Sequence, residues 1–549
     1  MGKNSKKRKQ PPTASLDVAD SNNRLSTAVK KLKAAPALGA AASVVKKVKE
    51  VPGLVHGSDS DDSTLAPSTP PLEKGKQVAV VAGDSDLIGG VIYEDELETT
   101  TDTLRLLAQN PSLIALKALK PFKTAVHDYW RVANEVGNTG SSLTSRISSA
   151  LVDQRHTDAL VLLSEMAIRE QLPKLGALQR WVRECDAVLT PTMSREEENK
   201  VWQVLDAILR TTQPEMVSRA KEGEDEGEVK EGTRLRWFKP FSVDPGPATY
   251  EPSADEAENR VSEKIAAAAS STLKPLQTTP GPERRPPNKH PLTLYFTPPT
   301  QTPPIPITPL DKRTRQPSRH SLPGVPGAFI INDALESFEC ESIVQMAEKI
   351  GMSPDEPIAG SAAQLASVLA HNLVWVADEQ FVGELFKRIE DLLPQEVHGG
   401  KVRGINRRFR IYRYRPGALY RPHIDGAWPA SSIASNSSST TESPTYSYIY
   451  DSDPTTYSRL TLLIYLNDSF SGGHTTFFLP SSVPGILEAR PIRPRTGTVA
   501  VFPHGAARGS LLHEGSGVIE GAKYVIRTEI LYEVDAKERV DGTALPGPM

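Results

Sequence analysis

Residue types that bind transition metals occur at a short spacing in the C-terminal part of the chain. Residues 421–425 read RPHID, so one residue separates His423 from Asp425, and a further histidine, His513, lies 88 residues after Asp425. Alternate residues of a strand point the same way, which lets His423 and Asp425 ligate one ion from one face. Two imidazoles and one carboxylate suit Fe(II) and leave coordination positions open for an oxidant and a co-substrate. The pattern therefore predicts an iron centre at His423, Asp425 and His513.

A strand that follows His513 carries two cations. Lys523 and Arg527 come ten and fourteen residues after that histidine, and strand alternation places them on one side together with Val525. Two buried cations on one face are unfavourable unless an anion meets them. A carboxylate is the natural partner, because a guanidinium can hold it as a fork. We therefore expect a carboxylate-bearing co-substrate beside the metal.

The elements that must position these residues form a helix-then-strand pattern between residues 324 and 534. Helical periods come first, in FECESIVQMAEKIG and EQFVGELFKRIEDLLP. Strand-like runs with turns follow: INRRFRIYRYRPG, SRLTLLIYLN, GGHTTFFLP, GTVAVFP and KYVIRTEILYEV. Helices followed by many short antiparallel strands predict an α+β domain built on a β-sandwich or jelly roll.

This segment resembles the superfamily of 2-oxoglutarate- and Fe(II)-dependent dioxygenases, in particular its prolyl 4-hydroxylase-like branch. The matching text is YRYRPGALYRPHIDG, LTLLIYLND, SGGHTTFF, GTVAVFPH and LLHEGSGVIEGAKYVIRTEILYE. The match covers residues 325–534, under half of the chain. It implies a double-stranded β-helix, or jelly roll, preceded by support helices. It also implies Fe(II), 2-oxoglutarate and O2 as cofactor and co-substrates, with ascorbate as a reductant that keeps the iron reduced.

The resemblance implies a metal site without further catalytic residues. His423, Asp425 and His513 look like the iron ligands. His504 is the rival for the distal position, since it follows the strand-like run GTVAVFP at a turn with Gly505. His513 is favoured because the basic strand follows it at the family's spacing.

The resemblance also implies a binding site for 2-oxoglutarate. Lys523 matches the basic position that holds the distal carboxylate of this co-substrate, and Tyr465 resembles a tyrosine that bonds the same carboxylate. Tyr414, nine residues before His423, looks like a second tyrosine of the pocket. Arg527 stands where the hydroxylases often carry a smaller polar residue. The spacing favours Lys523 as the main contact and the chemistry favours Arg527.

Two features depart from the family pattern. His474 stands where relatives commonly have an acidic residue after the Gly-Gly pair. Residues 429–457 form an insertion rich in Ser, Thr and Tyr. Because the insertion follows Asp425 closely, it is either a loop that covers the substrate or a disordered loop without such a role.

The implied activity is hydroxylation of a protein side chain, with proline as a candidate, coupled to conversion of 2-oxoglutarate to succinate and CO2. A dioxygenase acting on nucleic acid is an alternative, because a basic arm could deliver it. A non-catalytic scaffold with a dioxygenase-like domain is a third reading, and the complete ligand set argues against it. The N-terminus shows no secretory signal, which makes collagen an improbable target.

The composition predicts several segments rather than one core. Of the 46 prolines, 15 lie between residues 275 and 326, and aromatic residues make up only 6 % of the chain. We expect the following organisation: a disordered basic arm over 1–95, a separate all-α module over 97–213, an acidic then Pro-rich linker over 214–323, the dioxygenase domain over 324–534 and a tail over 535–549.

The chain is expected to be intracellular, with the nucleus favoured over the cytoplasm. Residues 1–50 hold twelve Lys and Arg against three Asp and Glu, and KKRK at 6–9 resembles a nuclear localisation signal. Nucleic-acid binding by this arm is only weakly indicated, because no aromatic side chains alternate with the charges. No apolar run reaches the roughly 18 residues of a membrane span. Cys185 and Cys340 lie far apart and predict no disulfide. The sequence does not indicate an oligomeric state.

Overall fold

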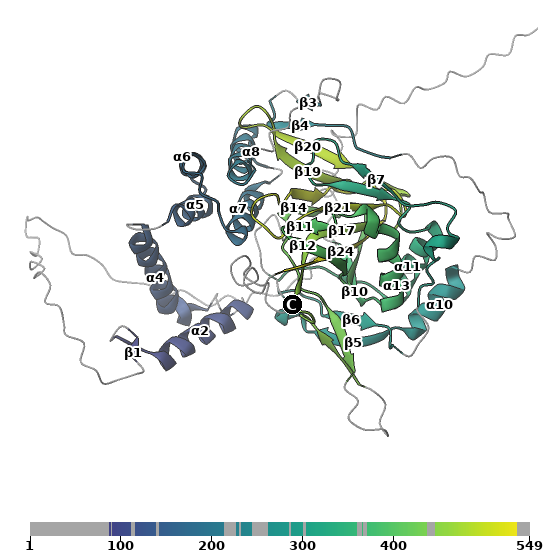
Figure 1. Cartoon of the computed structure of the whole chain (residues 1–549). Helices are drawn as coiled ribbons and strands as arrows, with labels where there is room; N and C mark the ends of the chain where they lie inside the picture. Colours follow the sequence, from purple (N-terminus) through teal and green to yellow (C-terminus); the bar gives the residue numbers. More distant parts are fainter. Residues whose placement is uncertain are drawn as a thin grey trace, which may run out of the picture. The chain divides into compact units, whose positions relative to one another are not determined.

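The computed structural model describes the chain in ranges separated by gaps (Figure 1). These ranges are 87–88, 91–110, 113, 116–138, 142–190, 192–213, 227–229, 232–243, 262–284, 287–299, 304–358, 365, 370–435 and 445–534. Most of the predicted N-terminal arm, with the KKRK run at 6–9, lies outside the described residues, and so does the predicted tail over 535–549. Within the described ranges, no helix is long and apolar enough to cross a membrane.

The chain divides into two compact units, residues 1–126 and 127–549. The described part of the first unit is a short antiparallel pair of strands followed by helices. Its elements are β1 (Leu87–Ile88), β2 (Ile92–Tyr93), α2 (Glu94–Gln109), η2 (Lys117–Leu119) and the start of α4 (Lys120–Asn138). Three acidic residues open α2, where they complement the positive end of the helix dipole. No residue of α2 is buried.

The second unit is built on a twelve-stranded major sheet whose main path runs β5-β6-β10-β13-β24-β17-β21-β8-β7. The strands of this path are β5 (Lys274–Thr279), β6 (Leu292–Phe296), β7 (Ser318–Ser321), β8 (Phe329–Asn332), β10 (His371–Val376), β13 (Arg408–Tyr414), β17 (Thr456–Tyr465), β21 (Val499–Pro503) and β24 (Lys523–Glu533). Three short strands attach to it: β9 (Ser353–Pro354), β11 (Glu396–Val397) and β12 (Gly400–Ile405).

A minor sheet of six strands packs against the inner face of the major sheet. Its order is β14 (Tyr420–Ile424), β22 (Leu512–Gly515), β19 (Thr475–Pro480), β20 (Leu487–Ile492), β4 (Leu235–Trp237) and β3 (Glu228–Val229). Buried aromatic side chains join the two sheets: Phe477 of β19 meets Phe502 of β21 edge-on, with ring centroids 5.1 Å apart. The predicted α+β architecture with a jelly-roll core is confirmed. Smaller pairs join β15 (Ser432–Ser435) to β16 (Tyr446–Ile449) and β18 (Phe470–Gly472) to β23 (Val518–Gly521).

Three helices cover the outer face of the major sheet (Figure 1). They are α10 (Ser262–Thr272), α11 (Ser337–Ile350) and α13 (Glu379–Ile389). Asp378 caps α13 by accepting a hydrogen bond from the backbone N–H of Phe381. A fully buried ion pair between Arg388 of α13 and Glu339 of α11, 2.7 Å long, ties these two helices together.

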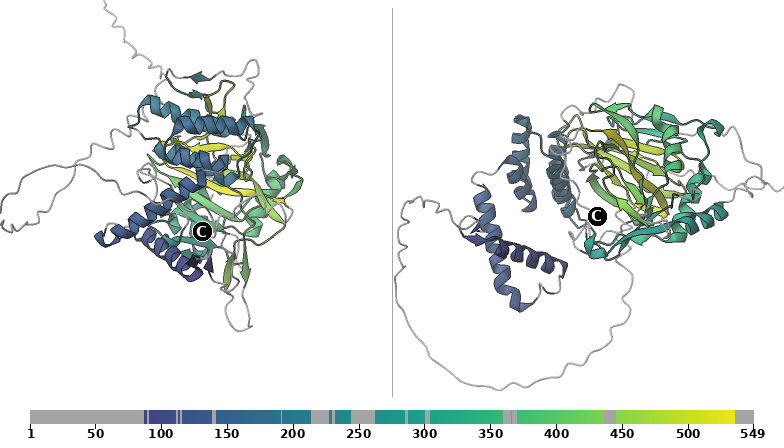
Figure 2. Two further views of the ribbon diagram at one scale, coloured as in Figure 1. Left: turned by 90° about the vertical axis from the view of Figure 1, so that its left-hand side faces the viewer. Right: turned by 60° about the horizontal axis from the view of Figure 1, so that its bottom comes forward.

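Helices α7 (Leu175–Val188) and α8 (Arg195–Arg210) cover the outer face of the minor sheet (Figure 2). Helices α5 (Leu143–Val152) and α6 (His156–Ile168) pack on α7 and α8. Trp181 of α7 and Leu205 of α8 belong to one buried cluster with Leu487, Leu512 and Phe478 of the sheet. Strands β19 and β20 of this sheet are buried on both faces, so they require a cover on the outside.

This packing corrects the predicted boundary between a separate helical module over 97–213 and the C-terminal domain. Residues 143–213 are helical, as predicted, but they belong to the same packed unit as the two sheets. Helical periodicity reveals that a face is apolar and does not reveal which surface will cover it.

The described part of the predicted linker over 214–323 is also structural, which corrects that prediction. Strand β6 pairs in parallel with β10, β5 pairs with β6, and β4 extends the minor sheet. The side chains of Leu292, Leu294 and Phe296 alternate inward along β6. Prolines are compatible with this arrangement because β5, which contains Pro275, is an edge strand.

We expect a fragment containing only residues 325–534 to aggregate, whereas a chain of residues 142–534 unfolds cooperatively. The shorter fragment loses α5 to α8 and the strands before β8, so it exposes the outer face of the minor sheet. Each large apolar side chain left in water costs about 1.5–3 kcal/mol. Soluble yield and thermal unfolding of both fragments test this expectation. Equal unfolding temperatures would show that the helices contribute nothing.

Candidate metal centre

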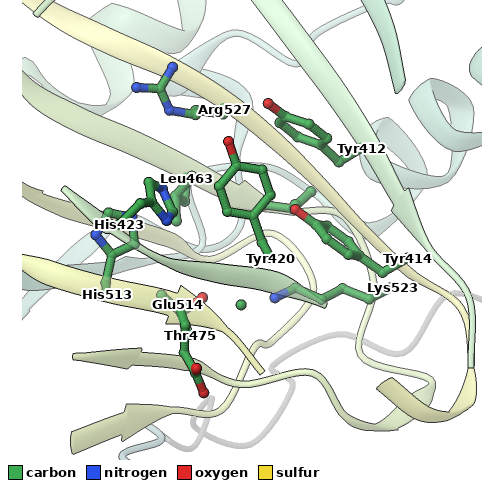
Figure 3. A pocket seen from close by; sticks show the side chains of 12 residues that line it. Tyr412, Tyr414, Tyr420, His423, Leu463, Thr475, His513, Glu514, Lys523 and Arg527 are labelled. Carbon is green, nitrogen blue, oxygen red and sulfur yellow. The ribbon is translucent and has the colours of Figure 1, made fainter. Parts of the chain in front are cut away.

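The predicted metal residues meet where β14 and β22 run side by side. His423 of β14 is the direct cross-strand partner of His513 of β22, and their ring centroids are 4.2 Å apart (Figure 3). Asp425 directly follows β14. One ligand atom from each of the three residues lies within 4.8 Å of the others. The structure thus brings His423, Asp425 and His513 to a single point.

Backbone carbonyls fix the tautomers of both histidines. The Nδ1 atom of His423 lies 2.8 Å from the carbonyl oxygen of Arg421, and that of His513 lies 3.1 Å from the carbonyl oxygen of Leu511. Since a carbonyl oxygen only accepts, each Nδ1 carries the hydrogen and each Nε2 keeps its lone pair. The Nε2 atoms lie 3.5 and 3.8 Å from the carboxylate oxygens of Asp425. Second-shell carbonyls of this kind are typical of metal-binding histidines.

The charges at the site also fit a cation. Burial opposes ionisation of Asp425, but Arg527 and the two imidazoles outweigh it and hold the pKa of this carboxyl well below its usual range. Burial, together with His423, lowers the pKa of His513 to about 3. Near neutral pH the site therefore presents an ionised carboxylate and a neutral distal imidazole. These are the protonation states that metal binding requires.

A buried hydrogen-bond relay stands behind Asp425. The hydroxyl of Thr461 donates to Asp425 Oδ2 at 2.7 Å, because an ionised carboxylate only accepts. Thr461 must then accept from Nδ1 of His504, also at 2.7 Å. Nε2 of the neutral His504 accepts from the hydroxyl of Ser458 at 2.7 Å, and Ser458 accepts from the backbone N–H of Trp428. His504 is therefore engaged in orienting Asp425 and does not stand in the metal position.

A cavity of about 40 Å3 opens beside the two histidines. In Figure 3 His423 and His513 lie at one side of it, and Lys523 and Tyr414 lie at the other. Its walls come from both sheets: Tyr412, Tyr414, Tyr420, His423, Leu463, Thr475, His513, Glu514, Gly515, Lys523, Val525 and Arg527. Lys523, Val525 and Arg527 share this wall, as the strand alternation predicts.

Lys523 is a buried cation without a carboxylate partner among the described residues. Its ammonium group donates to the carbonyl oxygen of Gly473 at 2.7 Å and lies 5.5 and 5.7 Å from the ring centroids of Tyr414 and Tyr465. Burial lowers the pKa of Lys523 to about 7. An anion in the cavity would relieve this cost of burial.

Arg527 already has anionic partners. One guanidinium nitrogen lies 3.0 Å from Asp425 Oδ1 and the other donates to Glu529 at 3.0 Å. Burial opposes the charge of Arg527, yet these two carboxylates raise its pKa. The two cations of the basic strand therefore differ: Arg527 neutralises the protein's own carboxylates, and Lys523 does not.

Comparison with known proteins agrees with this geometry. Residues 409–528 match the family described as the 2OG-Fe(II) oxygenase superfamily, over a segment that contains all the metal and pocket residues above. The chain carries a 2OG-Fe(II) oxygenase domain. It is an oxidoreductase domain whose cofactor is Fe(II) and whose co-substrate is 2-oxoglutarate, so the predicted superfamily is confirmed. No curated protein matches the chain.

Several solved structures align with part of this chain at low identity. A viral collagen prolyl hydroxylase from Paramecium bursaria Chlorella virus-1, in complex with 2OG, is 18% identical, with 38% of this chain and 97% of that chain covered and a TM-score of 0.24. A prolyl hydroxylase from Trichoplax adhaerens, in complex with a hypoxia inducible factor peptide fragment, is 17% identical, with 40% and 87% covered and a TM-score of 0.26. A Pseudomonas putida prolyl-4-hydroxylase is 15% identical, with 37% and 91% covered and a TM-score of 0.23.

The two predicted pocket tyrosines of the oxygenase domain lie around Lys523. Tyr414 lines the cavity, and Tyr465 is buried beside it with its hydroxyl donating to Thr475 Oγ1 at 2.9 Å. Burial raises the pKa of both phenols.

His474 follows the Gly-Gly pair, where an acidic residue is the family pattern. Burial, with Lys523 and Arg493, lowers the pKa of His474 to about 4. The neutral imidazole therefore leaves the charge of Lys523 unopposed.

The insertion over 429–457 is an ordered hairpin in its described part. Strands β15 and β16 pair, and Tyr446 packs against Phe296 with ring centroids 5.0 Å apart. Residues 436–444, between these two strands in the sequence, lie outside the described residues. The backbone N–H of Ser431 donates to Asn406 of the oxygenase domain, and the hydroxyl of Ser431 is hydrogen-bonded to Tyr448 within the insertion. The described strands are therefore packed on the sheet, which disagrees with a wholly disordered loop.

Several polar residues of the site were not predicted from the sequence. The missed residues are Gln179, Asp186, Tyr420, Ser458, Thr461 and Glu514. Tyr420 alone had a signal, since it precedes His423 by three residues in the matching motif. Thr461 sits on the strand-like run SRLTLLIYLN at an inward position, but alternation does not reveal that its hydroxyl meets Asp425.

Proposed function

We propose that the chain is an Fe(II)- and 2-oxoglutarate-dependent dioxygenase that hydroxylates a protein side chain, with a prolyl residue as the first candidate. One observation carries the proposal. Two histidines with free Nε2 lone pairs and an ionised carboxylate converge beside a cavity whose far side holds a buried lysine that has no carboxylate partner among the described residues. This arrangement suits a ligand that chelates the metal at one end and presents a carboxylate at the other.

The residues take separate roles in this proposal. His423, Asp425 and His513 would hold Fe(II), and Lys523 would receive the distal carboxylate of 2-oxoglutarate between Tyr414 and Tyr465. With O2 as the oxidant, the bound iron and 2-oxoglutarate would supply the oxidising chemistry: one oxygen atom would enter succinate, formed with CO2, and the other would hydroxylate the substrate. Arg527 and the relay through Thr461 fix the orientation and charge of Asp425. The chain supplies positions and charges, and no protein acid or base is required.

A protein substrate is supported by the resemblance to the prolyl 4-hydroxylase-like branch in residues 325–534. A nucleic-acid substrate is the second candidate. It is supported by the excess of nine positive charges in residues 1–50, which lie outside the described residues. We propose ascorbate as the reductant on the same resemblance. The complete ligand set favours a working site over a non-catalytic scaffold.

The experiment that tests this function is an anaerobic titration of the full chain with Fe(II) and 2-oxoglutarate. We expect a visible metal-to-ligand charge-transfer band, and succinate after oxygen is admitted. Absence of both the band and succinate would contradict the enzymatic role. Incubation with a library of proline-containing peptides and with single-stranded oligonucleotides then separates the two substrate classes, because the true class raises succinate formation and gains one oxygen atom in the mass spectrum.

We propose nuclear localisation through the KKRK run at residues 6–9. Four successive cations are a common import signal. Deleting residues 3–9 from a fluorescently tagged chain is expected to shift it from the nucleus to the cytoplasm. An unchanged distribution would contradict the signal.

A further inference from the structure

Helix α7 makes hydrogen bonds to β14 on both sides of His423. The amide of Gln179 donates to the carbonyl oxygen of Ile424 at 3.0 Å. The carboxylate of Asp186 accepts from Nε of Arg421 at 2.5 Å, and its backbone carbonyl accepts from the same guanidinium at 3.0 Å. These contacts join segments more than 230 residues apart in the chain.

The two residues that α7 contacts, Arg421 and Ile424, determine how the metal ligands are oriented. Arg421 provides the carbonyl oxygen that holds Nδ1 of His423, and therefore the tautomer that keeps its Nε2 free. Ile424 links His423 to Asp425 directly, so its carbonyl fixes the peptide from which Asp425 starts. A shift of either residue would move a ligand atom relative to its partner on β22.

Asp186 is an unusual residue for this position, which adds weight to the contact. It is buried at 4 % exposure on a helix face otherwise occupied by apolar side chains such as Trp181, Val182 and Cys185. A buried carboxylate is unfavourable unless it is paired and hydrogen-bonded. An apolar side chain at position 186 would pack against the sheet equally well. Packing therefore does not explain why a carboxylate is paired with Arg421 here.

We infer that Gln179 and Asp186 are positioning residues of the metal centre, and that α7 is part of the metal site although it lies outside the segment that matches the oxygenase family. This inference rests on the proposed function, because it takes His423 and Asp425 as ligands. Gln179 and Asp186 touch neither the metal position nor the cavity. They act by holding the two ends of the ligand-bearing segment, which keeps the ligand geometry preorganised.

The chain offers a matched control in Asp206 of α8. Asp206 is also a buried carboxylate on a helix that covers the minor sheet, and it is also paired with an arginine, Arg210, at 2.8 Å. It accepts in addition from the backbone N–H of Gly485 at 2.7 Å. None of its partners belongs to the metal strand. Asp186→Asn and Asp206→Asn therefore remove the same chemistry at two places of the helical layer.

The test compares these variants in the full chain by thermal unfolding and by Mn(II) affinity, measured from the free-ion signal in electron paramagnetic resonance without turnover. We expect both variants to lower the unfolding temperature, and only Asp186→Asn to weaken Mn(II) binding, by about tenfold. Gln179→Met, which keeps the side-chain size and removes the donor, is expected to weaken it in the same direction. Should Asp186→Asn fail to fold, Gln179→Met carries the comparison.

The outcomes separate the inference from the proposed function. Wild-type affinity in both Asp186→Asn and Gln179→Met, or equal weakening in Asp206→Asn, would overturn the positioning role while leaving the metal site in place. If the wild-type chain binds no Mn(II), or if His423→Ala leaves its Mn(II) affinity unchanged, the metal site is wrong, and the positioning role is wrong with it.

Discussion

Replacing His513 with alanine is expected to remove the charge-transfer band that Fe(II) and 2-oxoglutarate produce, whereas replacing His504 with phenylalanine is expected to leave a weaker one. His513 contributes a free Nε2 lone pair beside His423 and Asp425. Both ring nitrogens of His504 are engaged by Ser458 and Thr461. Loss of a second-shell partner of this kind lowers metal affinity by roughly 10- to 100-fold. Anaerobic titration of each variant measures the difference.

The order of the two effects decides between the histidines. A His504→Phe chain without any band, next to a His513→Ala chain with a normal one, would make His504 the distal ligand. Circular dichroism of both variants serves as the control, because His504 is buried and its replacement removes one of the two hydrogen-bond partners of Ser458 and of Thr461. A Thr461→Val variant is expected to resemble His504→Phe, since both break the same relay.

The second large effect concerns 2-oxoglutarate. Lys523→Met is expected to weaken its binding by roughly 10- to 150-fold, the equivalent of one charge-assisted hydrogen bond of about 1.5–3 kcal/mol. Arg527→Met is expected to change the affinity for 2-oxoglutarate only a few-fold and to weaken metal binding instead, because Arg527 is paired with Asp425 and Glu529. Titration with 2-oxoglutarate at saturating Mn(II) measures the first effect, and titration with Mn(II) alone measures the second.

The lowered pKa of Lys523 predicts that the affinity for 2-oxoglutarate falls as the pH rises. Burial lowers the pKa of the free Lys523 to about 7, and a bound carboxylate raises it again. Only the ammonium form pairs with the carboxylate. Affinity for 2-oxoglutarate is therefore expected to be constant below pH 7 and to fall by up to about tenfold for each pH unit above it. A Lys523→Arg chain, whose side chain keeps its charge, is expected to show no such fall.

Opposite results would be informative for both cations. If Arg527→Met abolished binding of 2-oxoglutarate while Lys523→Met did not, the co-substrate would take Arg527 away from Asp425. A flat pH profile of the wild-type chain would show that Lys523 stays charged, or that it does not touch the carboxylate.

The metal residues could be predicted because their signal is local. His423 lies on β14 and Asp425 directly follows that strand, whereas Lys523 and Arg527 share a face of β24 because alternate residues of a strand point the same way. The motif order then supplied the distance to His513. Alternation of side chains requires no knowledge of distant contacts, which is why this part of the site could be read from the sequence.

The helical cover and the strands in the Pro-rich region could not be predicted in this way. The surface that covers α7 and α8 is made by β19, β20 and β22, nearly 300 residues later in the chain. Strand β6 has only five residues, LTLYF, and lies between prolines. This alternating run is too short to predict a strand in a segment whose proline content predicts a linker. The pairing of Arg527 with Asp425 likewise depends on how the two sheets face each other, which periodicity does not record.

Strand β24 is the last strand described, yet it lies in the middle of the major sheet, between β13 and β17. It also carries both cations of the cavity. The ribosome synthesises the chain from its N-terminus. The place of β24 between β13 and β17 therefore stays empty until residue 533 has emerged. Until then both neighbouring strands present open edges, which invite pairing with other chains. Nascent chains of this protein should therefore depend on chaperones until the whole of β24, which carries Lys523 and Arg527, has emerged.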